Sequence, residues 1–98
     1  MPTLSKTEIA HKLKSLPAWT LRNGSLYRSL KFENFVKAFA FMTAAALESE
    51  KMNHHPDWSN SYNVVKISLQ THESQGITDL DFRLASKIEK LAEIFSAV

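Results

Sequence analysis

The sequence contains no cysteine, and it has only two glycines and three prolines among 98 residues. Without cysteine the chain can form no disulfide, no thiolate nucleophile and no cysteine-ligated metal site. The scarcity of glycine and proline, together with 44% hydrophobic residues, predicts a chain that is ordered nearly throughout. This length suits one compact domain, so we expect a single domain over residues 1–98.

Long apolar runs and clustered charges are also absent. The N-terminal residues contain no signal-peptide core, and the most apolar segment, FVKAFAFMTAAAL, is too short and too interrupted to span a membrane. The formal net charge is only +2 and the basic residues are scattered, unlike a surface that follows nucleic-acid phosphates. We therefore expect a cytoplasmic protein without a membrane partner or a direct nucleic-acid partner.

Helix and strand signals alternate from the start of the chain. Ser5 and Glu8 form an S-x-x-E capping box, which predicts a first helix over 6–15 that Pro17 ends. An Asn-Gly pair at 23–24 suits a tight turn with positive φ values. Because apolar residues alternate on both sides of this pair, the segment predicts a β-hairpin.

The segment at 34–51 follows a helical pattern that is apolar on most sides. Its apolar residues between Phe35 and Leu47 cover well over half of the helix circumference. A helix of this kind is usually covered on most sides. One sheet in so small a domain cannot cover all of it, so we expect a subunit interface along this helix.

Two strands and a helix are expected in the second half of the chain. A short strand is expected at 57–60 with a turn near 60–61, and residues 62–71 alternate as in a half-buried strand. Thr78 and Asp81 form a second capping box ahead of a C-terminal helix. The order α-β-β-α-β-β-α predicts an α+β fold, with an antiparallel sheet and helices packed on one face.

Two of the four histidines are adjacent, in EKMNHHPDW. His54 and His55 follow the long helix, which the next residue, a proline, is expected to stop, and His72 lies at the end of the last strand. Asp57 and Glu73 are close to them in sequence. Because a neutral imidazole can both accept and donate a proton, several imidazoles around one cavity could protonate a leaving hydroxyl and remove a proton elsewhere.

The spacing alone leaves other interpretations open. A His-His-Pro sequence is also typical of a surface loop. Three histidines and a carboxylate could hold zinc, although adjacent residues point in different directions and the helical His-x-x-x-His spacing is absent. His11, among lysines, fits a solvated residue. Helix capping fully explains the spacing of Thr78 and Asp81, and Trp19 and Trp58 are typical of a core.

Three segments together resemble one family. They are EKMNHHPDW, SYNVVKISLQTH and GITDLDFRLA. The pterin-4a-carbinolamine dehydratases have a similar order: a Glu-rich helix end, His-His-Pro and Trp, then Tyr-Asn before a strand ending in Leu-x-Thr-His, then Gly-(Leu/Ile)-(Thr/Ser)-x-x-Asp. The resemblance covers nearly the whole chain.

The resemblance implies a four-stranded sheet, a homodimer or homotetramer, and a reaction. The reaction is loss of water from 4a-hydroxytetrahydropterin, which gives the quinonoid dihydropterin and recycles the cofactor of the aromatic amino acid hydroxylases. Neither a metal nor an organic cofactor is required.

The resemblance also implies roles for individual residues. His54, His55 and His72 would be catalytic, with His55 favoured as the acid. The substrate would meet Asn53, His54, His55, Gln70, Thr71, His72 and Glu73, and the site would be supported by Glu50, Pro56, Trp58 and Asp81. Some members have Asp at the position of Asn53. A neutral amide cannot supply the charge of that carboxylate, so we expect no proton transfer at Asn53.

A binding module is the alternative function. Mammalian members of the family also act as dimerisation cofactors of a homeodomain transcription factor through a helical surface. In this chain the corresponding surface would be the helix that contains Phe35–Leu47.

Overall fold

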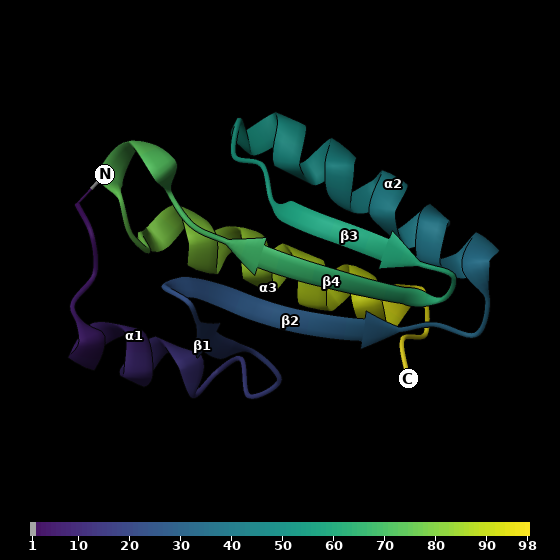
Figure 1. Ribbon diagram of the computed structural model, residues 1–98, viewed down its shortest axis with the longest axis horizontal. Helices are drawn as coiled ribbons and strands as arrows, with labels where there is room; N and C mark the ends of the chain where they lie inside the picture. Colours follow the sequence, from purple (N-terminus) through teal and green to yellow (C-terminus); the bar gives the residue numbers. More distant parts are fainter. Residues whose placement is uncertain (1) are drawn as a thin grey trace.

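The computed structural model describes residues 2–98, which form three α-helices, four β-strands and one short 3-10 helix (Figure 1). The elements are α1 (Lys6–Leu13), β1 (Thr20–Arg22), β2 (Ser25–Lys31), α2 (Phe35–Met52), β3 (Asp57–Ser61), β4 (Val64–Leu69), η1 (His72–Ser74) and α3 (Asp79–Ile94). This order confirms the α-β-β-α-β-β-α prediction.

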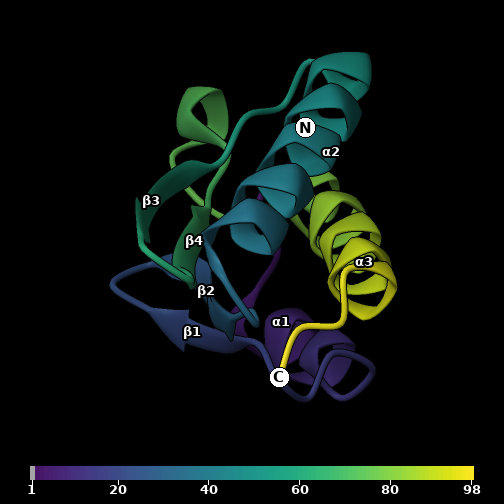
Figure 2. The same cartoon turned by 90° about the vertical axis from the view of Figure 1, so that its right-hand side faces the viewer.

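The four strands form one antiparallel sheet in the order β1-β2-β4-β3. Figure 2 shows the three α-helices on one side of this sheet, with α2 beside α3. The α+β prediction, with helices on one face, is therefore confirmed. None of the helices within residues 2–98 has the length and apolar character needed to cross a membrane.

The core lies between the sheet and the helices. Alternate residues of β4 point into it, and Val65, Ile67 and Leu69 are fully buried as the sequence pattern predicts. Phe41 of α2 packs against Phe32, with ring centroids 4.9 Å apart. Burial of apolar surface between these two layers is the main stabilising contribution to a fold of this size.

Both predicted capping boxes are present. The Ser5 hydroxyl accepts a hydrogen bond from the Glu8 amide at 3.1 Å, and the Glu8 carboxylate accepts one from the Ser5 amide at 2.9 Å. The bond from the Ser5 amide is the main reason that the pKa of Glu8 lies below its usual value. α1 ends at Leu13 rather than Ser15, because bonds such as Ser15 N–H to Lys12 O tighten its last turn.

The turn between β3 and β4 lies at Tyr62 and Asn63, later than the predicted position at 60–61. Tyr62 adopts a left-handed conformation with φ of 50°. The Asn60 side-chain amide donates hydrogen bonds to the Tyr62 and Val64 carbonyls, both at 3.0 Å. Asn60 thus stabilises the turn from within the strand, whereas an aromatic residue with positive φ is unusual.

One side of α2 packs on the sheet, and the opposite side is exposed. Ala38, Phe41 and Ala45 are fully buried. The exposed large apolar residues, here called the α2 strip, are Phe35, Val36, Phe39 and Leu47. The apolar helix pattern is therefore confirmed, and one domain leaves part of it uncovered.

Two isoleucines of α3 provide a matched test of the core. Ile88→Ala should lower the free energy of unfolding by about 2–5 kcal/mol, because Ile88 is fully buried and its removal leaves a cavity. Ile94→Ala, at a residue that is 71% exposed, should cost about 1 kcal/mol or less. Urea denaturation of both variants measures the difference. Equal losses would contradict this account of the core.

Candidate active site

The histidine pair follows a helix end that Asn53 determines. Asn53 has left-handed φ and ψ of 49° and 43°, and its amide donates to the Glu50 carbonyl at 3.1 Å. The next amide, of His54, donates to the Ser49 carbonyl at 3.0 Å. These are the two bonds of a Schellman motif, in which asparagine is a common alternative to glycine. The helix thus ends before Pro56, and the proline was not needed to stop it.

The Schellman turn directs the His54 side chain into the protein. The residue is 7% exposed, and its Nε2 lies 2.6 Å from Oδ1 of Asp81 in the first turn of α3. Asp81 is fully buried. A charged group is costly to bury unless it is paired and hydrogen-bonded, so separating His54 from Asp81 would be costly. The contact therefore connects the end of α2 to α3.

The second oxygen of Asp81 also has donors. Oδ2 accepts from the Thr78 amide and from the Thr71 hydroxyl, both at 2.9 Å. Every buried side-chain nitrogen or oxygen in residues 2–98 has a hydrogen-bond partner. With three donors around it, the Asp81 side chain has the surroundings that a buried carboxylate requires.

These contacts determine which nitrogen of His54 carries a proton. A carboxylate only accepts hydrogen bonds, so Nε2 of His54 must be the donor to Asp81. No residue within 2–98 bonds to the other ring nitrogen, Nδ1, and no buried polar side-chain atom of that range lacks a partner. Nδ1 is therefore not fully buried, and in the neutral imidazole it is a proton acceptor.

His55 points away from the core. Its side chain is 57% exposed, and its Nε2 lies 2.8 Å from Oε1 of Glu50 in the last turn of α2. The structure thus brings Glu50, predicted as a supporting residue, into contact with His55. The pair holds an imidazole with a proton on Nε2 in a position open to solvent.

His72 follows β4, next to the start of β3. It begins η1 after β4, its side chain is 66% exposed, and its Nε2 is 3.4 Å from Oδ2 of Asp57 at the start of β3. Asp57 pairs with Ser68 in the sheet register, so the chain leaves β4 beside the point where it enters β3. This pairing brings the His72 loop and the His54-His55 segment to one end of the sheet.

The remaining predicted residues differ in their surroundings. Gln70 is half-buried and Glu73 is exposed in the loop after β4. Trp58 is half-buried and packs against the core, so the expectation that it is a core residue is only partly met, whereas Trp19 is buried. The α1 residue His11 is exposed, as expected.

The loop that carries His72 is closed by backbone contacts. Thr71 and Gly76 form an isolated bridge, and the Thr71 amide donates to the Gly76 carbonyl at 2.9 Å. The N-terminal segment lies over this loop, where Leu4 N–H donates to the Ile77 carbonyl at 2.8 Å. A Cβ atom at Gly76 would lie 2.9 Å from Cγ2 of Thr3, so a larger residue there would require the Thr3 side chain to shift.

His54, His55 and His72 each lie beside a carboxylate. Within the described residues 2–98, no three His, Asp or Glu side chains converge on a position that could hold a metal ion. The three-histidine zinc alternative therefore has no ligand cluster in this part of the chain.

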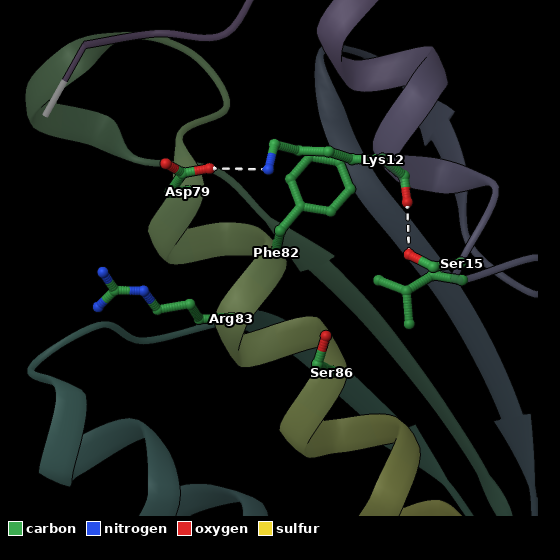
Figure 3. Close-up of a pocket in the computed structure, with 7 residues that line it drawn as sticks. Lys12, Ser15, Asp79, Phe82, Arg83 and Ser86 are labelled. Carbon is green, nitrogen blue, oxygen red and sulfur yellow. Dashed lines mark hydrogen bonds and ion pairs between the residues drawn. The ribbon is translucent and has the colours of Figure 1, made fainter.

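A separate hollow of about 370 Å³ lies between α1 and α3 (Figure 3). Lys12 and Asp79 form an ion pair of 3.3 Å at its edge, and Arg83 extends away from this pair. The lining residues are Lys12, Ser15, Leu16, Asp79, Phe82, Arg83 and Ser86. None of the predicted site residues lines it.

Comparison with known proteins agrees with the resemblance seen in the sequence. The family model described as pterin 4 alpha carbinolamine dehydratase matches residues 2–91. This chain belongs to that family. A relative from Solibacter usitatus, provisionally named a pterin-4-alpha-carbinolamine dehydratase, is 53% identical over 91% of this chain and 94% of its own length. A relative from Sinorhizobium medicae with the same provisional name is 46% identical over 92% of this chain and 88% of its own.

Solved structures of dehydratase-like proteins share the fold. The crystal structure of a transcriptional coactivator/pterin dehydratase from Brucella melitensis has a TM-score of 0.90 and 40% identity, and it covers 92% of this chain and 98% of its own. A pterin dehydratase-like protein identified as a RuBisCO assembly factor has a TM-score of 0.64 at 21% identity, covering 76% and 86% of the two chains. The second similarity concerns the fold alone.

Sequence reasoning missed two contributions to this dehydratase-family site. The partner of His72 is Asp57, which was noted only as a neighbour in sequence. The side chain of Thr71 is buried against Asp81 and Thr78, although Thr71 was considered only as a substrate contact. The strand alternation offered a signal, because a threonine following the buried Leu69 by two residues lies on the same inner face.

Two aspartates in the first turn of α3 allow the effect of a buried charge to be compared with that of a surface charge. Asp81→Ala should lower the free energy of unfolding by about 3 kcal/mol or more, because donors from His54, Thr71 and Thr78 lose their acceptor. Asp79→Ala removes only an exposed pair with Lys12 and should cost about 1 kcal/mol or less. Chemical denaturation of both variants measures this, and similar losses would contradict the proposed importance of the Asp81 contacts.

Proposed function

We propose that this protein catalyses the dehydration of 4a-hydroxytetrahydropterin to quinonoid dihydropterin and water. The observation that carries the proposal is the gathering of three histidines, each paired with a carboxylate, at one end of the sheet. Membership of the dehydratase family supports the choice of substrate. In cells this reaction would recycle the tetrahydropterin cofactor of aromatic amino acid hydroxylases.

The reaction requires two proton transfers and no change of oxidation state. The C4a–O bond breaks as its hydroxyl receives a proton and leaves as water. A ring nitrogen loses its proton, and the released electron pair forms the C=N bond of the quinonoid product. Histidine side chains can supply and remove these protons without a metal or an organic cofactor.

We assign the base to His54 and the acid to His55. His54 has its Nε2–H bonded to Asp81, so Nδ1 is the acceptor for the substrate proton. His55 is exposed and hydrogen-bonded to Glu50, so as an imidazolium it can deliver a proton to the leaving hydroxyl. His72, beside Asp57 at the start of β3, would contact the bound ring.

The predicted substrate contacts come from the two chain segments that flank the histidines. Gln70 between β4 and η1 is half-buried, Glu73 of η1 is exposed, and Asn53 is exposed before His54. Backbone groups of the loop would bind the polar edge of the pterin ring. The half-buried Trp58 and Pro56 would support the same region from β3 and its approach.

The α2 strip supports a second proposal, self-association. Phe35, Phe39 and Leu47 are exposed on one helix although they are large and apolar. A homodimer or homotetramer would bury them. A regulatory protein with an apolar helix could use the same surface, and a solved relative is described as a transcriptional coactivator/pterin dehydratase.

Histidine variants test the catalytic proposal. His55→Ala, His72→Ala and His54→Gln, which keeps a donor for Asp81, should each lower kcat by about 10²-fold or more because a proton-transfer or binding group is lost. His11→Ala is the matched control on exposed α1 and should keep the full rate. Stopped-flow absorbance measures water loss from 4a-hydroxytetrahydropterin. Full rates in both His55→Ala and His72→Ala would contradict the proposed mechanism.

A charge placed in the α2 strip tests self-association. Phe39→Asp should convert the wild-type oligomer into a smaller species, because a buried unpaired carboxylate would be costly. Val98→Asp adds the same charge at another exposed apolar residue and should leave the assembly unchanged. Analytical ultracentrifugation measures both. A monomeric wild type at micromolar concentration would contradict the interface, and self-association without pterin turnover would favour the binding module.

A further inference from the structure

Two buried hydroxyls connect the candidate histidines. Thr71 is 3% exposed and Thr78 is fully buried, and their hydroxyl oxygens lie 2.7 Å apart. Thr71 Oγ1 is also 2.9 Å from Oδ2 of Asp81. The hydrogen bonds of both hydroxyls lie within the protein, and they lead to the Asp81 carboxylate.

The direction of the hydrogen bonds in this chain is determined by its acceptor. The Asp81 carboxylate can only accept, and Thr71 has one hydroxyl proton, so Thr71 donates that proton to Oδ2. The Thr78 hydroxyl must then donate to Thr71 Oγ1, while Thr78 Oγ1 accepts from the Leu80 amide at 3.2 Å. The chain of donors therefore ends on the carboxylate that holds His54.

Thr71 also connects the two parts of the site. It directly precedes His72 in the chain, and its amide and carbonyl are bonded to Gly76 across the loop. Its hydroxyl is bonded to Asp81, whose other oxygen holds His54. Thr71 thus connects the loop that carries His72 to the Asp81 carboxylate that binds His54.

From this arrangement we infer that the Thr71 hydroxyl is a positioning group, which orients the Asp81 carboxylate and so maintains the Nε2-protonated form and the orientation of His54. This role deepens the proposed dehydratase function and rests on it for its catalytic consequence. The Thr71 side chain and backbone amide are bonded within the protein. A contact between Thr71 and the substrate stays a prediction.

A hydroxyl deletion and its conservative counterpart test this role. Thr71→Val removes the donor and keeps a branched side chain, whereas Thr71→Ser keeps the donor. We expect Thr71→Val to lower kcat by about tenfold with KM changed less than about twofold, because an active-site group is misoriented while substrate contacts remain. Thr71→Ser should restore most of kcat. Circular dichroism verifies the fold, and Thr71→Ala replaces the valine variant if that variant does not fold.

Nitrogen-15 NMR of the histidine rings provides a readout that does not depend on turnover. Wild type and Thr71→Ser should show a proton on Nε2 of His54 that exchanges slowly with water, and Thr71→Val should show faster exchange or proton population on Nδ1. Unchanged His54 signals and unchanged kcat in a folded Thr71→Val protein would overturn the inference. If wild type has no turnover but the NMR change occurs, the dehydratase proposal fails while the positioning role stands.

Discussion

The buried carboxylate of Asp81 is the constraint on which this end of the molecule depends. It sits in the first turn of α3, where it caps the helix through the Thr78 amide. The same group accepts from Thr71 after β4 and from His54 after α2. Because a buried carboxylate is costly without such donors, three elements distant in sequence must meet at one position. The hydrogen bonds that satisfy Asp81 also position His54 and the loop that carries His72.

Local patterns predicted most of the fold. The capping boxes, the apolar alternation of β4 and the apolar helix at 34–51 all depend on neighbouring residues, and the structure confirms them. Three details differed: α1 ends at Leu13 because its last turn tightens, Asn53 rather than the proline ends α2, and the β3–β4 turn lies later, where Tyr62 is left-handed. Residue identity alone is a weak signal of a left-handed conformation. Tyrosine in particular disfavours positive φ values.

The site was predictable only in part. His54, His55 and His72 were identified from the family resemblance, and the strand pairing explains why they lie at one sheet end. The contact of Asp81 with His54 spans 27 positions, and the helix-capping role already explained its spacing with Thr78. Pairing of His72 with Asp57 likewise depends on tertiary structure. Long-range contacts of this kind leave no periodic signal in one sequence.

In the proposed mechanism, Asp81 keeps Nδ1 of His54 free to accept a proton. Asp81→Asn tests it most directly, because an amide keeps the shape of the side chain but can donate to Nε2 of His54 and move the ring proton to Nδ1. The measurement is kcat for dehydration of 4a-hydroxytetrahydropterin, with Asp79→Asn as the control. We expect kcat to fall by about 10²-fold or more in folded Asp81→Asn and to stay unchanged in the control. A folded Asp81→Asn protein with the wild-type rate would contradict the proposed mechanism.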